Sequence, residues 1–310
     1  MMGLTTRSGA PVSRFAYGAM QWGGRASEDD AAAMYRACRA AGISHFDTAH
    51  AYTDGASERM LGALVGPERD AVFVATKVAY EGGSGRGNIL GSFSESRERL
   101  GLEVVDLLYL HRWDGDAPLE ETFSTLAELQ EGGSVRYLGV SNFAAWQVMK
   151  AQVVAERFGT RIDAIQPMMN LVKRQVEVEI LPMAADQGIA VFPYSPLGGG
   201  LLTGKYAAGG AGRLSEDDRY AARYGLSWMR EAADGLARTA SEVGVPAATL
   251  AVAWLARHAP EVGPILSART AEQLEPSLAG MTFAMDDALY ERITALSPAP
   301  PPATDRIEEA

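Results

Sequence analysis

Residues 43–52 read ISHFDTAHAY, an apolar run followed at once by polar and aromatic side chains. Two further segments share this design, VFVATK at residues 72–77 and VDLLYLHRWD at residues 105–114. Short apolar runs rich in β-branched or aromatic residues are typical of buried strands. Each of these runs ends in groups that hold or move a proton, namely Asp47, Tyr52, Lys77 and His111. The pattern predicts strands whose carboxyl ends carry functional side chains.

Apolar runs of this kind recur along the whole chain, with helical spacing between them. Strands are expected over residues 15–20, 43–48, 72–77, 105–111, 136–141, 164–166, 189–194 and 262–267. Helices are expected over residues 28–41, 57–65, 89–100, 119–131, 144–158 and 175–187. Parallel strands joined by helices form an open doubly wound sheet or a closed barrel, and eight regular units favour the (β/α)8 TIM barrel. We expect one α/β domain over residues 1–310.

Three segments depart from this alternation. Residues 4–8 and 11–14 flank Gly9 and Ala10, which predicts an N-terminal β-hairpin that closes the barrel floor. The long polar, glycine-rich stretch after strand seven, between Tyr194 and Ser227, is expected to be a lid or a cofactor clamp. Residues 298–310 are rich in proline and acidic residues, so we expect a flexible tail.

Composition excludes several function classes. Lys plus Arg total 28 against 39 for Asp plus Glu, and the net charge of -11 disfavours nucleic-acid and anionic-membrane partners. A single cysteine, Cys38, forms no intramolecular disulfide, and with no signal-like N-terminus or long apolar run it predicts a cytoplasmic protein. The 4 histidines lack metal-ligand spacing, so no metal site is expected. Oligomeric state is undetermined, and a monomer is compatible with the sequence.

The four polar residues at the strand ends are the parts needed to protonate a carbonyl oxygen. A phenol has an ordinary pKa of about 10, and we expect the Lys77 ammonium to lower the pKa of Tyr52. Asp47 would hold Lys77 charged, and the His111 imidazole would orient the substrate oxygen. Taken singly, each residue is better explained as a chance occurrence at a strand end.

Motifs along nearly the whole chain resemble those of the aldo-keto reductase superfamily. They are GAMQWGG (18–24), FDTAHAYTDGASERMLG (46–62), TK (76–77), LHRWD (110–114), GVSNF (139–143), QPMMN (166–170), YSPLGGGLLTGKY (194–206) and SARTAEQLE (267–275). The resemblance implies that Tyr52 is the general acid, that Lys77 and Asp47 tune it and that His111 binds the carbonyl group. It also implies hydride transfer from the nicotinamide C4 atom, which converts an aldehyde or ketone into an alcohol.

The cofactor site is predicted from residue chemistry together with this resemblance. Tyr194 offers a flat face to the nicotinamide ring, while Ser141, Asn142 and Gln166 offer hydrogen bonds to its carboxamide. Backbone amides of a glycine-rich segment suit a pyrophosphate, and an arginine suits a 2′-phosphate, which favours NADPH over NADH. The full predicted set is Met20, Gln21, Trp22, Ser141, Asn142, Gln166, Tyr194, Ser195, Leu197, Gly199, Leu201, Lys205, Ser267, Arg269 and Gln273. Neither a Rossmann nor a Walker motif occurs.

The chain departs from the family pattern near the adenine end of this site. Ser277 stands where the family has an asparagine, Ser267 where it has a glycine, and Met169 where an aromatic residue is common. For the small-molecule substrate we expect pocket walls formed by Trp22, Tyr80 and Trp113.

Two alternative functions remain compatible with the sequence. One is an NADPH-binding redox-sensing regulatory subunit with little turnover, as occurs among family members. The other is an unrelated barrel lyase or isomerase that forms a Schiff base on Lys77.

Overall fold

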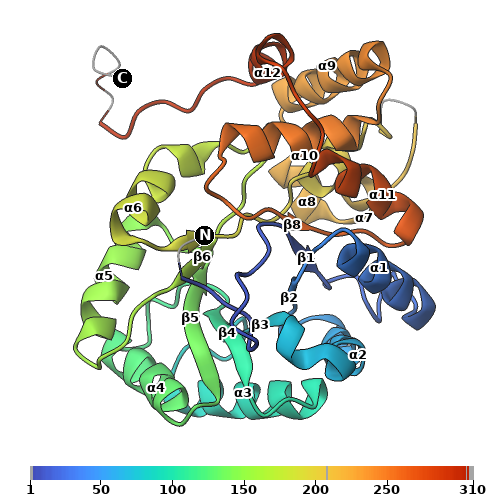
Figure 1. Cartoon of the computed structure of the whole chain (residues 1–310). Coiled ribbons are helices and arrows are strands. Elements are labelled where there is room, and N and C mark those ends of the chain that lie inside the picture. Colours follow the sequence, from blue (N-terminus) through green and yellow to red (C-terminus); the bar gives the residue numbers. More distant parts are fainter. Residues whose placement is uncertain (1–2, 207–208, 305, 307–310) are drawn as a thin grey trace.

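The computed structural model describes residues 3–206, 209–304 and 306, and within them the strands form a single curled sheet. All pairs are parallel, in the order β7-β6-β5-β4-β3-β2-β1-β8, and helices surround the sheet (Figure 1). The strands are β1 (Ala16–Gly18), β2 (His45–Asp47), β3 (Phe73–Val78), β4 (Val105–Leu110), β5 (Val135–Ser141), β6 (Ala164–Gln166), β7 (Ala190–Val191) and β8 (Ile265–Leu266). Backbone N–H groups of Gly263 and Ile265 donate to the carbonyls of Val191 and Pro193, so the two ends of the strand order meet, consistent with a (β/α)8 barrel.

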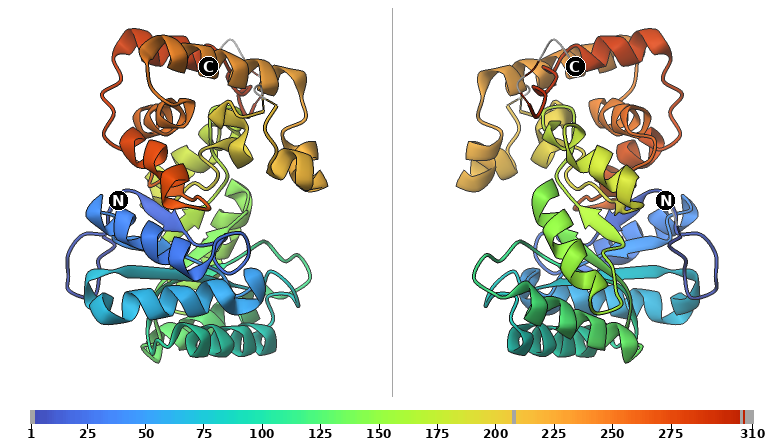
Figure 2. Two further views of the ribbon diagram at one scale, coloured as in Figure 1. Left: turned by 90° about the vertical axis from the view of Figure 1, so that its right-hand side faces the viewer. Right: turned by 90° about the vertical axis from the view of Figure 1, so that its left-hand side faces the viewer.

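Helices follow the strands in regular alternation. The first six are α1 (Glu28–Ala40), α2 (Ala56–Val65), α3 (Arg86–Leu100), α4 (Leu119–Glu131), α5 (Ala145–Glu156) and α6 (Ile180–Gln187). Between β7 and β8 lie α7 (Arg213–Glu216), α8 (Asp218–Arg223), α9 (Ser227–Val243) and α10 (Ala247–His258), and α11 (Ala271–Gly280) and α12 (Asp287–Thr294) come last. Figure 2 shows the helices α9, α10 and α12 grouped at the end of the molecule away from α2, α3 and α4.

Helix α1 shows how the sequence sets one of these elements. Ser27 caps its amino end by accepting a hydrogen bond from the N–H of Asp30, and the Asp30 side chain bonds the Ser27 backbone in return. The acidic residues of its first turn suit the positive end of the helix dipole. Buried side chains recur at helical spacing and pack on the barrel, namely Ala31, Met34, Tyr35 and Cys38.

Side chains inside the barrel alternate with side chains that face the helices. The inner cluster contains Ala16, Phe73, Ala75, Leu107, Tyr109, Ala164, Ala190, Phe192 and Ile265. Because side chains alternate along a strand, the next inward positions on β3 and after β4 are Lys77 and His111. The strand pattern therefore carries both residues to the carboxyl end of the barrel interior.

The segment before β1 closes the opposite end of the barrel. Leu4 and Val12 belong to the inner cluster, and Thr5 forms an antiparallel bridge with Pro11. Arg136, at the start of β5, donates a hydrogen bond of 2.8 Å to the Thr5 carbonyl. Thr5 and Pro11 thus form a single bridge, and the described residues before β1 contain no pair of extended strands where the hairpin is expected.

Prolines account for three of the differences between expected and observed bounds. Strands β1 and β2 are also shorter than expected, and α3 begins at Arg86 instead of residue 89. Strands β7 and β8 contain two residues each, because Pro193 and Pro264 lack the N–H needed for a continuous ladder. Helix α6 begins at Ile180 instead of residue 175, which places Pro182 in its first turn, and Gln175–Glu177 form a separate 3-10 helix. The residues expected to form a lid or clamp contain the short helices α7 and α8. Part of the expected tail, residues 305 and 307–310, lies outside the described residues.

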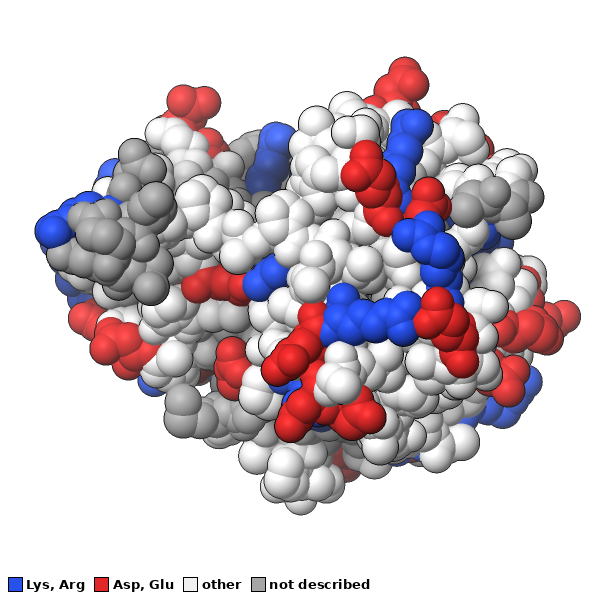
Figure 3. Space-filling model, turned by 90° about the horizontal axis from the view of Figure 1, so that it is seen from above, with Lys and Arg blue, Asp and Glu red and all other residues white. Residues whose placement is uncertain are grey.

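The surface of the described residues carries both signs of charge. On the face drawn in Figure 3, acidic and basic side chains are interleaved. Among the described helices none is by itself long and apolar enough to cross a membrane, although α9 and α10 together reach the required length and composition across a bend of 103°.

Candidate active site

A buried ion pair lies at the carboxyl ends of β2 and β3. The Lys77 ammonium contacts the Asp47 carboxylate and also donates to the Thr48 carbonyl at 2.8 Å. Gln166, at the end of β6, donates from Nε2 to the other Asp47 oxygen at 2.9 Å. Lys77 is 1% exposed, and its ammonium is occupied by the Asp47 carboxylate and the Thr48 carbonyl. This arrangement opposes the alternative in which Lys77 forms a Schiff base.

Tyr52 and His111 lie beside this ion pair. The Lys77 Nζ atom is 5.0 Å from the centroid of the Tyr52 ring, and the Tyr52 and His111 ring centroids are 5.7 Å apart, edge to face. No side chain or backbone group among the described residues hydrogen-bonds the Tyr52 hydroxyl. The barrel thus brings together the four residues that the sequence analysis singled out, with the phenol hydroxyl free to meet a ligand.

The charge states of these groups follow from burial. Burial, with the nearby Lys77 and Arg112 charges, lowers the pKa of His111 to about 3, so its imidazole is neutral at physiological pH. Burial also raises the pKa of Asp47 and lowers the pKa of Lys77, with each partner opposing the shift of the other.

The expectation that Lys77 lowers the pKa of Tyr52 is wrong for this structure. Burial and the Asp47 carboxylate raise the pKa of Tyr52 well above its ordinary value. The ammonium is paired with Asp47, so the carboxylate offsets part of its attraction for a phenolate. Tyr52 therefore holds its proton firmly before any reaction.

A second set of hydrogen bonds adjoins the first. Asn142 donates to the His111 carbonyl at 3.0 Å and accepts from the Tyr194 hydroxyl at 2.7 Å. Ser141 donates to the Gln166 carbonyl at 2.9 Å. Residues predicted to contact the nicotinamide are therefore linked to one another and, through Gln166, to Asp47.

Backbone strain is concentrated at this end of the barrel. All five non-glycine residues with positive φ among the described residues follow strands β2, β3, β5 or β7, and they are Thr53, Asp54, Ala79, Asn142 and Ser195. Such conformations cost free energy and persist where surrounding contacts enforce them, often at functional sites.

The glycine-rich segment after β7 offers bare backbone. Gly198, Gly199 and Gly200 have φ of 57°, 66° and 99° within a 3-10 helix that also holds Leu201 and follows Leu197. A Cβ on Gly199 would lie 2.7 Å from the Tyr220 ring, so α8 packs directly on this backbone. The predicted Lys205 side chain folds back over Gly200.

The predicted adenine end lies beside α7 and α11. Arg269 is 3.7 Å from a Glu216 oxygen, and the same carboxylate pairs with Arg25 at 2.8 Å. The Ser267 hydroxyl is buried without a partner among the described residues, and Gln273 accepts the Arg269 backbone N–H at 3.4 Å. The sequence analysis did not predict the roles of Glu216 and Arg25. The feature that could have indicated Glu216 is an acidic residue in the long loop, which could pair with the arginine predicted to bind a phosphate.

These residues fit a phosphorylated dinucleotide. A buried hydroxyl without a partner among the described residues, two positions before an arginine, suits a phosphate. The buried Gln21 Oε1 atom also lacks a partner among the described residues, and Met20 beside it is half-buried. The Ser267 hydroxyl and the Arg269 guanidinium are therefore the donors that suit a phosphate group here.

Two of the three expected substrate walls lie near the mouth of the barrel. Tyr80 is 38% exposed, its ring centroid is 4.7 Å from that of His111, and the Arg112 guanidinium lies over it at 5.2 Å. Trp113 packs edge to face on Phe143, with ring centroids 5.2 Å apart.

The assignment of Trp22 to the substrate pocket is wrong. Trp22 is fully buried, its indole N–H donates to the Tyr17 hydroxyl at 3.2 Å, and it lines no accessible surface. Its ring packs in the hydrophobic core between β1 and the surrounding helices.

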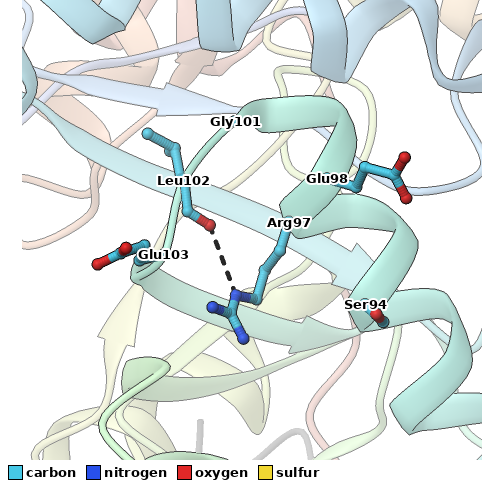
Figure 4. A pocket seen from close by; sticks show the side chains of 6 residues that line it. All are labelled: Ser94, Arg97, Glu98, Gly101, Leu102 and Glu103. Carbon is cyan, nitrogen blue, oxygen red and sulfur yellow. Dashed lines mark hydrogen bonds between the residues drawn. The ribbon is translucent and has the colours of Figure 1, made fainter.

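A shallow polar hollow lies away from this site. It is lined by Ser94, Arg97, Glu98, Gly101, Leu102 and Glu103 at the end of α3 (Figure 4). Arg97 donates across it to the Leu102 carbonyl at 3.5 Å. The hollow precedes β4, whereas the site described above lies at the carboxyl ends of the strands.

Comparison with known proteins agrees with this geometry. Residues 14–298 match the model of the aldo/keto reductase family. The chain is similar to a probable voltage-gated potassium channel subunit beta of Oryza sativa subsp. japonica, with 35% identity over 86% of both chains. It is 39% identical to aflatoxin B1 aldehyde reductase member 2 of Mus musculus over 64% of this chain and 56% of that protein. It is 31% identical to L-glyceraldehyde 3-phosphate reductase of Escherichia coli O157:H7 over 79% of this chain and 78% of that protein.

Proposed function

Because the chain belongs to the aldo/keto reductase family of oxidoreductases, we propose that it reduces an aldehyde or ketone to an alcohol with NADPH. The observation that carries this proposal is the convergence of Tyr52, His111 and the Lys77 ion pair at one end of the barrel. The proposed substrate is a small carbonyl compound, bound near the exposed Tyr80 ring.

The chain's own residues bind and protonate the carbonyl oxygen. When bound, a reduced nicotinamide supplies the hydride. The neutral His111 imidazole donates a hydrogen bond to the carbonyl oxygen and orients it toward Tyr52. As the oxygen gains negative charge, the Tyr52 hydroxyl transfers its proton to it. Lys77 then stabilises the phenolate that remains.

The raised pKa of Tyr52 is compatible with this role. The acid must hold its proton until charge develops on the substrate oxygen, and an alkoxide is a much stronger base than a phenolate. A phenol whose pKa is raised keeps its proton at neutral pH, as an ordinary phenol does. The proton therefore moves only when hydride transfer has begun.

The proposed preference for NADPH depends on the anionic end of the site. Arg269 and the unpartnered Ser267 hydroxyl would hold the 2′-phosphate, and Glu216 contacts both Arg269 and Arg25. We propose that α7 and α8 act as a clamp over the cofactor, with Tyr220 resting on Gly199.

Replacing Tyr52 by phenylalanine tests the reaction. Oxidation of NADPH by an aromatic aldehyde, followed by absorbance, should fall by at least about 100-fold, the scale of general acid catalysis. NADPH binding, measured by fluorescence titration, should be unchanged. Tyr137→Phe is a matched control, because the Tyr137 hydroxyl bonds the N-terminal segment at the opposite end of the barrel. Full activity of Tyr52→Phe would refute the proposal.

A second candidate function is an NADPH-binding, redox-sensing regulatory subunit with little turnover. Its support is the similarity to the rice protein named as a probable channel subunit. Tight NADPH binding together with negligible turnover of sugar, aromatic, pyridoxal-like and short-chain carbonyl compounds would favour it over the reductase.

A further inference from the structure

A second buried carboxylate stands behind the catalytic group. Glu58 on α2 is fully buried, and its Oε1 atom accepts a hydrogen bond of 2.6 Å from the Thr76 hydroxyl. Thr76 directly precedes Lys77 on β3, and because strand side chains alternate it faces α2 while Lys77 faces the barrel interior. Glu58 therefore fixes the stretch of backbone from which Lys77 projects.

Arg99 on α3 joins this carboxylate to the loop that carries Tyr52. Its Nη1 atom lies 3.5 Å from Glu58 Oε2 and donates to the His50 carbonyl at 3.2 Å. A Cβ on Gly55, whose φ is +78°, would lie 2.6 Å from the Arg99 side chain. Arg99 thus contacts the loop on both sides of Tyr52, at His50 and at Gly55.

Glu95 holds the other end of the guanidinium. Its Oε2 atom accepts from Arg99 Nη2 at 2.9 Å and lies 2.9 Å from His50 Nε2. The His50 backbone N–H donates to the Lys77 carbonyl at 3.0 Å. One continuous set of contacts therefore runs from the Lys77 backbone through Glu58 and Arg99 to the Tyr52 loop.

We propose that Glu58 and Arg99 are positioning residues that set the placement of Tyr52 relative to Lys77. The proposal rests on the reductase function proposed above. The Glu58 charge also helps to keep Lys77 protonated, since it opposes the effect of burial on the Lys77 pKa. A buried ion pair contributes little stability compared with well-packed apolar residues, whereas its fixed donors and acceptors specify position.

The experiment uses Arg99→Met, Arg99→Lys and a matched control on the same helix, Arg86→Met, whose exposed side chain pairs with Glu128 at 2.8 Å. With Arg99→Met, kcat for a reducible aldehyde should fall roughly 10- to 100-fold, the scale of a displacement of about 1 Å. The dissociation constant of NADPH should stay within about threefold, because Arg99 contacts no predicted cofactor residue. The isotope effect with 4-deuterated NADPH should rise or stay at its maximum, Arg99→Lys should recover part of the rate, and Arg86→Met should behave as wild type.

Three results would overturn the proposal. They are a wild-type kcat in Arg99→Met, an Arg99→Met variant that is impaired only in NADPH binding, and a decrease in kcat that is as large in Arg86→Met as in Arg99→Met. If Arg99→Met does not fold, Glu58→Gln, which keeps an acceptor for Thr76, takes its place with the same expected results. Amide hydrogen exchange over residues 49–55 gives a reading independent of turnover, since it should accelerate in the variant and stay unchanged in Arg86→Met. An inactive wild-type protein would refute the reductase function, whereas unchanged exchange would refute the positioning role.

Discussion

Replacing Lys77 by methionine removes the ammonium group from the barrel interior and leaves the Asp47 carboxylate buried. Asp47 is 3% exposed, and Gln166 would be its remaining hydrogen-bond partner among the described residues. Breaking a buried pair by removing one partner costs about 3 to 5 kcal/mol of the free energy of unfolding. The complementary variant Asp47→Asn leaves a buried ammonium and should cost a similar amount.

The two variants should respond to pH in opposite directions. Burial raises the pKa of Asp47, so in Lys77→Met the charged carboxylate is destabilising above its unfolded pKa of about 3.9. The loss in free energy of unfolding should grow as pH rises from about 3.9 to the folded pKa of Asp47, and it should stay constant above that pKa. Burial lowers the pKa of Lys77. In Asp47→Asn the loss in free energy of unfolding is therefore largest below the folded pKa of the lysine, and it shrinks as pH rises.

Urea denaturation followed by circular dichroism at about pH 5, 7 and 9 measures both trends. The double variant Lys77→Met, Asp47→Asn removes both charges and should be more stable than the sum of the single losses predicts, by about 2 kcal/mol or more. Deficits that do not change with pH, or that add without coupling, would refute the assignment of Asp47 and Lys77 as a charged buried pair.

Three further outcomes are expected. Arg269→Leu should weaken NADPH binding roughly 10- to 100-fold, the scale of about 1.5 to 3 kcal/mol for a charged hydrogen bond, and leave NADH binding unchanged in a fluorescence titration. Glu216→Gln removes the contacts to Arg25 and Arg269, which are partly exposed, so stopped-flow release of NADPH should accelerate by about fivefold or less. The His111 ring should stay neutral until pH approaches about 3, as read from its imidazole NMR shifts, and a midpoint near its ordinary value would contradict the burial seen here.

The strand and helix order followed from the sequence because each element has its own periodicity. Helix α4 and strand β6 have the predicted bounds, Leu119–Glu131 and Ala164–Gln166. The shorter β7 and β8 required knowledge of which backbone N–H groups the barrel uses, and Pro193 and Pro264 interrupt them.

The candidate site was less predictable where it depends on contacts between distant segments. Residues at strand ends could be foreseen, because parallel strands bring their carboxyl ends to one side. Two predictions failed because of burial. Trp22 is enclosed by the core instead of lining a pocket, and desolvation raises the pKa of Tyr52, which Lys77 was expected to lower. The placement of Tyr220 on Gly199 depends on how α8 packs, which no local pattern encodes.

The segment that closes the barrel floor has a practical consequence. Residues Leu4 and Val12 fill the interior at one end of the strands, whereas the candidate site opens at the other. A surface tether or fusion partner joined ahead of Gly3 would lie on the face remote from the candidate site. Immobilising the protein through its N-terminus should therefore orient the candidate site toward the solution. Leu4→Asp should detach the N-terminal segment from the barrel interior without changing Tyr52, Lys77, Asp47 or His111.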